Sequence, residues 1–125
     1  MVDNKIYDVF FYKDKNDCEP LFDYIEELAN RTDKNSRIIS NKISTYITYL
    51  QRIGLHVRGP YAKHLIDEIW ELRPLNHRIL YSQWDEESFI LLHHFIKKTQ
   101  KTPQREIDQA KRNLADFRER SKQNE

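Results

Sequence analysis

The chain has 125 residues, of which 38% are hydrophobic and 33% are charged, and a formal net charge of +1 at pH 7. This size fits one domain with a modest core, and the periodic apolar segments argue against disorder. No stretch approaches the roughly 20 apolar residues of a membrane span, and the first residues lack a signal-peptide pattern, so we expect neither insertion nor secretion. The single cysteine, Cys18, excludes an intramolecular disulfide and a multi-cysteine zinc site, which favours a reducing cytoplasm.

The first half of the chain is predicted to contain one strand and two helices. Residues 5–12, "KIYDVFFY", are rich in aromatic and β-branched side chains and precede the turn-forming "KDKNDC". Pro20 suits the first turn of a helix, in which apolar residues recur at spacings of three and four. A second helix is predicted from about Lys34, and Gly54 is well placed to end it in a left-handed conformation. The short connection predicts a helical hairpin.

The second half is predicted to contain three strands and a helix. After a loop around "HVRGPYAK", three runs are typical of strands: residues 68–73, 77–84 and 88–96. The short separators "PLN" and "DEE" predict antiparallel hairpins. Pro103 then opens a third helix, and the tail at about 119–125 is expected to fray. The whole chain, 1–125, is therefore predicted to be a single α+β domain in the order strand, two helices, three strands, helix.

Basic side chains are concentrated near the ends of the predicted strands. Arg73 ends one strand, Arg78 begins the next, and residues 93–105 contain four cations, two histidines and no acid. We expect Arg73, Arg78, Lys97 and Lys98 to converge on one phosphate-binding surface, because the planar guanidinium suits phosphate oxygens and lysine adds positive charge. The same charges also fit the solvated side of a half-buried sheet, and the lysines would keep a sheet edge soluble. The pattern alone leaves both interpretations open.

His93 and His94 are adjacent in a predicted strand, so only one of them can face a given pocket. A histidine beside cations suits proton transfer near neutral pH. The five histidines lack paired metal-ligand spacing, and the acidic turn at residues 85–87 is more typical of a solvated turn than of a two-metal site. We therefore expect no metal and no cofactor, and any strand cleavage would use the 2′-hydroxyl of RNA as nucleophile.

Two segments carry a likeness to a known family. "IWELRPLNHRILY" followed by "FILLHHFIKKTQKTPQREIDQAK" resembles the HigB-like branch of the RelE/ParE toxin superfamily, and "FYKDKN…EPLFDYIEEL" and "GPYAKHL" extend the likeness over nearly the entire chain. The resemblance implies a RelE/ParE-like fold and a bacterial or phage-derived toxin that cleaves messenger RNA on the ribosome, an mRNA interferase. It also implies a cytoplasmic location and a HigA-like helix-turn-helix antitoxin, through which alone the toxin would contact operator DNA.

The resemblance also implies roles for particular residues. Arg73 and Arg78 would bind phosphate and stabilise its transition state. Lys97 and Lys98 would add positive charge. His93 is the candidate for proton transfer. These five residues form the predicted catalytic set of a metal-independent endoribonuclease.

Other assignments stay open. Lys63 and Lys101 would hold messenger or ribosomal RNA. His94 occupies a position at which relatives often carry a smaller residue, so the proton-transfer role could fall to it rather than to His93. Members of the superfamily differ in chemistry, and two alternatives remain: a non-enzymatic, ParE-like inhibitor of DNA gyrase, and a protein-binding module whose basic surface docks its partner.

Overall fold

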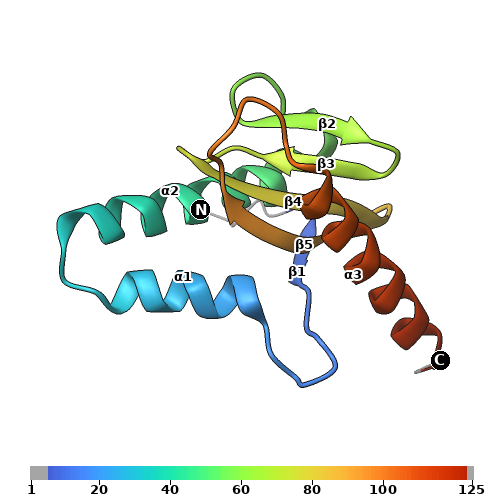
Figure 1. Cartoon of the computed structure of the whole chain (residues 1–125). Helices are drawn as coiled ribbons and strands as arrows, with labels where there is room; N and C mark the ends of the chain where they lie inside the picture. Colours follow the sequence, from blue (N-terminus) through green and yellow to red (C-terminus); the bar gives the residue numbers. More distant parts are fainter. Residues whose placement is uncertain (1–5, 124–125) are drawn as a thin grey trace.

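The computed structural model describes residues 6–123, which form three α-helices and one five-stranded mixed sheet (Figure 1). In chain order the elements are β1 (Asp8–Phe11), α1 (Pro20–Asn30), α2 (Lys34–Ile53), the 3-10 helix η1 (Gly54–His56), β2 (Ala62–Ile66), β3 (Ile69–Leu72), β4 (His77–Asp85), β5 (Ser88–Ile96) and α3 (Gln104–Gln123). Within this range, none of the helices has the length and apolar character needed to cross a bilayer.

The sheet has the strand order β1-β5-β4-β3-β2. Strands β2 to β5 pair antiparallel with their neighbours, and the long β4–β5 hairpin forms the centre. The first strand, β1, lies at the edge beside β5 and pairs with it in parallel, and the chain then runs through the two helices to β2 at the opposite edge. A parallel connection needs a crossover of a dozen or more residues, and here the α1–α2 hairpin lies in the crossover.

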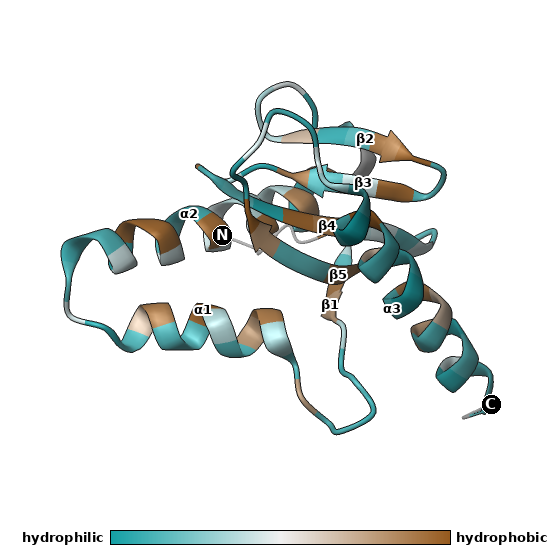
Figure 2. Ribbon diagram, viewed as in Figure 1, coloured by the Kyte–Doolittle hydropathy of each residue, from teal (hydrophilic) through white to brown (hydrophobic). Residues whose placement is uncertain are grey.

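Helices cover both faces of the sheet. The α1–α2 hairpin packs on one face, where Leu50 of α2 meets Ile79 and Phe89 of the central hairpin. Helix α3 packs on the other face, where its Leu114 joins a second cluster that includes Ile90. Strands that are buried on both faces are expected to be apolar along most of their length, and Figure 2 shows brown, hydrophobic stretches along the central strands. The sheet is therefore the middle layer of the core.

The structure corrects the predicted order of elements in the sheet. Residues 62–66 form β2, although the sequence assigned a loop around "HVRGPYAK" and only three strands after the helices. This strand lies at an edge and most of its residues are exposed, so its sequence lacks the alternation that marks a half-buried strand. These residues form a strand because they pair with β3. The sheet is also mixed rather than purely antiparallel, because β1 joins it in parallel.

The ends of the elements differ from the prediction in smaller ways. The first strand, predicted over residues 5–12, is Asp8–Phe11, and Lys5 lies outside the described residues. Helix α3 continues to Gln123, so the segment predicted to fray is helical that far, and residues 124–125 lie outside the described range. The remaining strands and helices agree with the predicted positions to within one or two residues.

The end of α2 depends on a glycine. Gly54 has φ +54° and ψ −123°, a conformation that side chains with a Cβ rarely adopt. A Cβ at this position would also overlap the ring of Tyr7, which packs edge-on against Phe89. The chain can therefore end α2 at this position, with Tyr7 packed closely against it, because residue 54 lacks a side chain.

We expect Gly54→Ala to lower the free energy of unfolding by about 3 kcal/mol, because it adds both backbone strain and a steric overlap with Tyr7. Gly59→Ala is the matched control: its φ is +69°, but no atom lies within 4 Å of the added Cβ, so it should cost only about 1 kcal/mol. Urea unfolding of both variants measures the difference, and equal losses would contradict the role of the Tyr7 contact.

Candidate functional site

Glu71 on β3 is the centre of a cluster of charged side chains. Its side chain is only 4% exposed, and its Oε2 atom lies 3.6 Å from Nε of Arg73 and 3.9 Å from Nε of Arg78. Residues two apart share a face of a strand, which puts Glu71 and Arg73 together. The antiparallel pairing sets Leu72 opposite Ile79 and so brings the start of β4 beside the end of β3. One arginine just after β3 and one in β4 therefore flank one buried carboxylate.

The loop at residues 97–103 is attached to this cluster at two points. Thr102 Oγ1 donates a hydrogen bond to Oε1 of Glu71 at 2.6 Å. The backbone N–H of Lys97 donates to the carbonyl of Asn76 at 2.7 Å, and Asn76 lies in the turn between β3 and β4. The loop that carries three of the predicted lysines is therefore held beside the two arginines.

The arginines keep unused hydrogen-bond donors. Their Nε–H groups are buried, and neither has a hydrogen-bond partner among the residues that the structure describes. The distances to the carboxylate exceed the usual N–H···O range of about 2.7–3.2 Å, so the attraction is Coulombic. Arg78 is fixed instead through Nη1, which donates to the carbonyls of Leu75 at 3.0 Å and His77 at 2.7 Å.

Burial changes the electrostatics of Arg78. Desolvation lowers the pKa of its guanidinium, Glu71 opposes that shift, and Arg73 adds to it. An arginine starts from so high a pKa that the group stays charged near neutral pH. One carboxylate therefore faces two guanidinium groups, and the cluster keeps an excess of positive charge in a partly dehydrated place.

The other predicted lysines lie around this cluster. Lys63 is opposite Glu71 in the β2–β3 pairing, so it belongs to the same face of the sheet, and it is exposed. Lys98 lines a pocket of about 280 Å³ beside the start of α3. Lys101 is exposed in the 97–103 loop. The cationic residues named from the sequence thus gather on the α3 side of the sheet and at the end where the loop crosses it.

A bulge in β5 decides how the two histidines are directed. The pairing with β4 shifts between Leu80, which lies opposite His93, and Tyr81, which lies opposite Leu91. Leu92 is therefore an extra residue in β5. Without it, regular alternation would put His93 on the same face as Leu91, toward the helical hairpin. With it, His93 lies on the face of the arginines.

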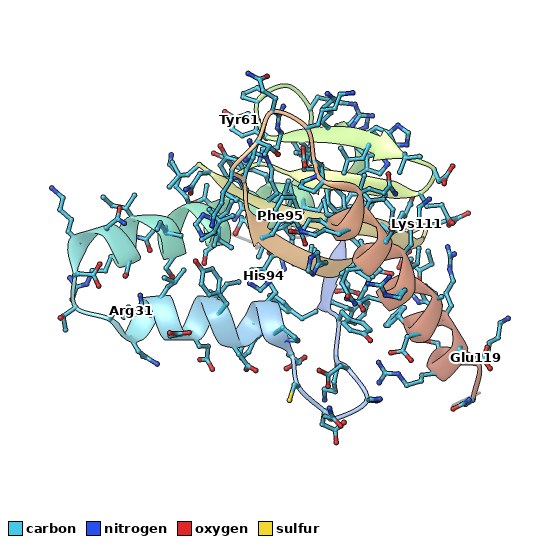
Figure 3. The ribbon with its side chains drawn as sticks, viewed as in Figure 1. Arg31, Tyr61, His94, Phe95, Lys111 and Glu119 are labelled. Carbon is cyan, nitrogen blue, oxygen red and sulfur yellow. The ribbon has the colours of Figure 1, made fainter. Side chains whose placement is uncertain are left out.

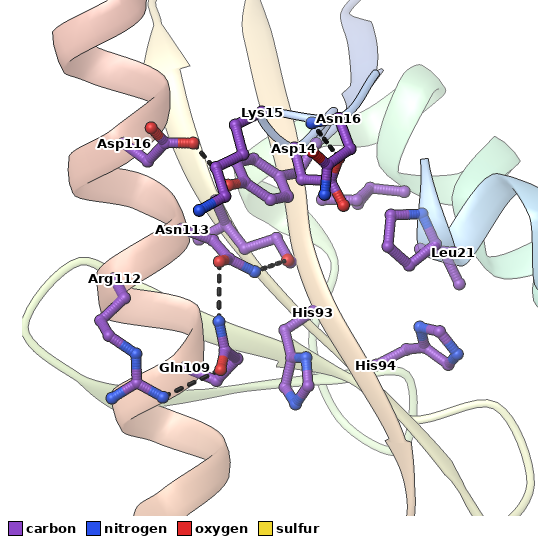
Figure 4. Close-up of a pocket in the computed structure, with 14 residues that line it drawn as sticks. Asp14, Lys15, Asn16, Leu21, His93, His94, Gln109, Arg112, Asn113 and Asp116 are labelled. Atoms are coloured by element: carbon purple, nitrogen blue, oxygen red, sulfur yellow. Dashed lines mark hydrogen bonds between the residues drawn. The ribbon is translucent and has the colours of Figure 1, made fainter. Parts of the chain in front are cut away.

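His93 and His94 consequently have different surroundings (Figure 4). The Nε2 atom of His93 is 2.8 Å from Oε1 of Glu106, at the start of α3. His94 projects toward α1 and stacks on Tyr24, with ring centroids 4.9 Å apart (Figure 3). Burial lowers the pKa of His94 to about 4, and the nearby His93 and His77 act in the same direction. His94 is therefore a neutral, packed ring, whereas His93 has a carboxylate partner.

The acidic turn lies away from the arginines. Its residues close the β4–β5 hairpin, at the opposite end of β4 from Arg78. Asp85 accepts hydrogen bonds from the backbone N–H of Glu87 at 2.9 Å and from Oγ of Ser88 at 2.7 Å. Between residues 6 and 123, no three His, Cys, Asp or Glu side chains gather in a way suited to a metal ion. Asp85 stabilises a turn.

Three residues of the site were missing from the prediction. For Glu71 a signal was available, because alternation along a strand puts this carboxylate on the face of Arg73. Thr102 and Glu106 carried no such signal. Their contacts with Glu71 and His93 depend on the path of the loop from β5 to α3 and on the direction of that helix.

The family comparison covers this site. The model of the family described as "Phage derived protein Gp49-like (DUF891)" matches residues 29–115, which include α2, all of β2 to β5 and the first half of α3. The chain belongs to the Gp49-like family. The Gp49-like family is a RelE/HigB-like family of toxins associated with toxin–antitoxin systems, so membership implies an antitoxin partner. A search of curated proteins finds no match.

We expect Glu71→Gln to lower the free energy of unfolding by about 3 kcal/mol, because it removes the carboxylate that, within residues 6–123, is paired with the two partly buried guanidinium groups, while keeping an acceptor for Thr102. Urea unfolding measures the loss. The matched control is Glu27→Gln, since Glu27 and Arg31 form a pair whose side chains are 59% and 52% exposed, and its loss should be about 0.5 kcal/mol or less. Equal losses in the two variants would contradict the structural importance of the cluster.

The low pKa of His94 predicts a pH-dependent stability. The unfolded chain takes up a proton near pH 6.5, whereas the folded chain keeps this ring neutral down to about pH 4. The contribution of His94 is therefore complete above pH 6.5 and is lost as the pH falls through this window.

His94→Phe tests this contribution, because phenylalanine keeps a flat ring against Tyr24 and cannot titrate. His93, His77 and Glu106, the other titratable groups that influence His94, are present in both proteins. Between pH 6.5 and 4 we expect the wild type to lose about 2 kcal/mol more unfolding free energy than the variant. Parallel stability curves would show that His94 is not held neutral by the fold.

Proposed function

We propose that this Gp49-like toxin is a ribosome-dependent endoribonuclease that cleaves messenger RNA without a metal ion. The observation that carries the proposal is the arrangement of Arg73 and Arg78, which are held around Glu71 by charge while their Nε–H donors remain unused. A buried N–H without a partner costs free energy. An anion with several oxygens that entered the cluster would satisfy these donors and take up the excess positive charge.

A scissile phosphodiester fits this description. In RNA the 2′-oxygen attacks the adjacent phosphorus, the bond from phosphorus to the 5′-oxygen breaks, and the products are a 2′,3′-cyclic phosphate and a 5′-hydroxyl. The pentavalent transition state carries more negative charge than the ground state. Preorganised guanidinium groups that meet this charge in a dehydrated place stabilise the transition state more than the substrate. Arg73 and Arg78 would supply this stabilisation.

The reaction also moves two protons. One leaves the 2′-hydroxyl and one arrives at the 5′-oxygen. His93 would carry one of these transfers, because it lies on the arginine face and Glu106 fixes the orientation of its ring through Nε2. The neutral, stacked His94 is less suited to the role.

The lysines would hold the larger partner. Lys63, Lys98 and Lys101 are exposed and Lys97 is half-buried, and all four would contact messenger RNA and ribosomal RNA through phosphates. The partner in the cell would be a HigA-like antitoxin, which would also be the component that contacts operator DNA. Action on ribosomes implies a cytoplasmic location.

We expect Arg73→Ala to slow ribosome-dependent cleavage by about 100-fold or more, as is typical when a transition-state donor is removed. The backbone N–H of Arg73, which bonds the carbonyl of Tyr61, remains in the variant. Arg52→Ala is the control, because Arg52 is exposed in the last turn of α2, and it should cleave normally. Mapping of mRNA ends with purified protein and ribosomes measures the rates, and circular dichroism verifies the fold.

A substrate with a single 2′-deoxy nucleotide at the cut site should resist cleavage, because it lacks the nucleophile of the proposed reaction. Cleavage of the deoxy substrate, or full activity of Arg73→Ala, would refute the mechanism. Inhibition of DNA supercoiling by gyrase without any RNA cleavage would instead support the non-enzymatic alternative. If neither the RNA nor the supercoiling changes, the remaining hypothesis is a protein-binding module without catalysis.

A further inference from the structure

A second cavity lies next to the proposed site. It has a volume of about 540 Å³ and opens between β5, α3 and the connection from β1 to α1 (Figure 4). Apolar side chains form part of its lining: Leu21, Leu91 and Leu92. This size and this mixture of apolar wall and few polar groups are typical of small-ligand pockets. His93 and His94 both line this cavity, so the expectation that only one of them can face a given pocket is wrong here. The cavity therefore adjoins the residue that we assign to proton transfer.

Two amide side chains on α3 are fixed inside this cavity. Asn113 Nδ2 donates to the carbonyl of Leu92 at 2.8 Å, and Gln109 Nε2 donates to Oδ1 of Asn113 at 2.9 Å. Arg112 in turn donates to Oε1 of Gln109 at 2.9 Å. Each amide nitrogen has two hydrogens and each amide oxygen accepts two bonds, so both groups keep one donor and one acceptor to offer. This chain of hydrogen bonds fixes the orientation of both amides. A site that recognises a ligand by its pattern of donors and acceptors needs such fixed groups.

Charged side chains of both signs line the cavity. Asp116 accepts a hydrogen bond from Arg120 at 2.7 Å, and Asp14 accepts from backbone N–H groups of its own loop. These carboxylates are therefore already engaged. Lys15 and Arg112 also line the cavity, and neither belongs to an ion pair within the part of the chain that the structure describes. The hydrogen bond from Arg120 lowers the pKa of Asp116, and Lys15 adds to this shift. The charge of Lys15 is therefore partly balanced inside the cavity, whereas Arg112 lies beside the amides. A ligand with a flat polar ring matches the amides, and a phosphate attached to it could meet Arg112.

We propose that this cavity, the base pocket, binds one unpaired nucleobase of the RNA substrate next to the cleaved bond, with Gln109 and Asn113 reading its hydrogen-bonding edge. The inference rests on the proposed function and adds to it the place where sequence preference arises. Single-stranded RNA is normally recognised through splayed bases that meet polar side chains at their edges. A base in the pocket would hold its own ribose near His93 and direct the neighbouring phosphate toward the arginines.

Mononucleotides test the pocket without any cleavage. The full-length protein is titrated with AMP, GMP, CMP and UMP, and with ribose 5-phosphate and inorganic phosphate as probes that lack a base. NMR follows the side-chain amide signals of Gln109 and Asn113. At least one nucleotide should shift both signals saturably, and the two probes without a base should not. Nucleotides that perturb only the region of Arg73 and the 97–103 loop would overturn the proposal.

Variants at glutamine positions of α3 test whether the amides inside the cavity bind the nucleotide. Gln109→Ala should weaken nucleotide binding about tenfold, as expected for the loss of hydrogen bonds that the base makes. Gln104→Ala is the matched control, because it removes an amide of the same helix that bonds Asp108 outside the cavity, and it should bind normally. Asn113→Ala removes an anchor of α3 and is informative only with a native circular dichroism spectrum, so Gln109 carries the test.

Cleavage mapping distinguishes this inference from the proposed function. Gln109→Ala should change which bases flank the cut sites while Gln104→Ala cuts at the wild-type positions. If RNA is cut and Gln109→Ala changes neither nucleotide affinity nor base preference, the base pocket is wrong and the ribonuclease assignment stands. If nucleotides shift the two amide signals but no RNA is cut, the ribonuclease assignment is wrong and the pocket remains a nucleotide site.

Discussion

The placement of one buried carboxylate between two arginines constrains the rest of this structure. Burying a charge is costly unless an opposite charge lies close by, and Glu71 needs a partner as much as Arg78 does. The partners come from β3, from β4 and, through Thr102, from the loop before α3. The charge of Glu71 is therefore balanced by the arginines only when the strand register and the path of the loop are both correct. The remaining positive charge is what makes the cluster suited to an anion.

The sheet supports this cluster because its strands carry apolar side chains in their middle and charged side chains near one end. In the middle of β4 and β5, side chains on both faces enter the two apolar clusters beneath the helices. At the start of β4 the α3 face carries Arg78 instead, opposite Phe95 of β5, which packs at the edge of the second cluster. The rigid core therefore fixes charged groups at its border, where they are partly shielded from water.

Helix α3 links the arginine cluster with the neighbouring cavity. Its first turn supplies Glu106, which holds His93, and the next turns supply Gln109 and Asn113. Since Asn113 also bonds the backbone of Leu92 at the bulge, the helix is tied to the residue that sets the direction of His93. A shift of α3 would alter both the histidine and the amides. Positions on one helix thus connect the group proposed to move a proton with the groups proposed to read a base.

The sequence by itself determined the helices and the central strands, because the 3.6 and 2.0 periods of apolar side chains and the turn residues are local signals. Alternation along a strand also puts Glu71 on the face of Arg73. The sequence could not find β2, whose exposed residues form a strand only because β3 offers an edge. Nor could it decide between His93 and His94, because an extra residue at Leu92 reverses the alternation and leaves no mark in a single sequence. Contacts such as Thr102 with Glu71 join residues 31 apart in the chain, and only the folded path brings them together.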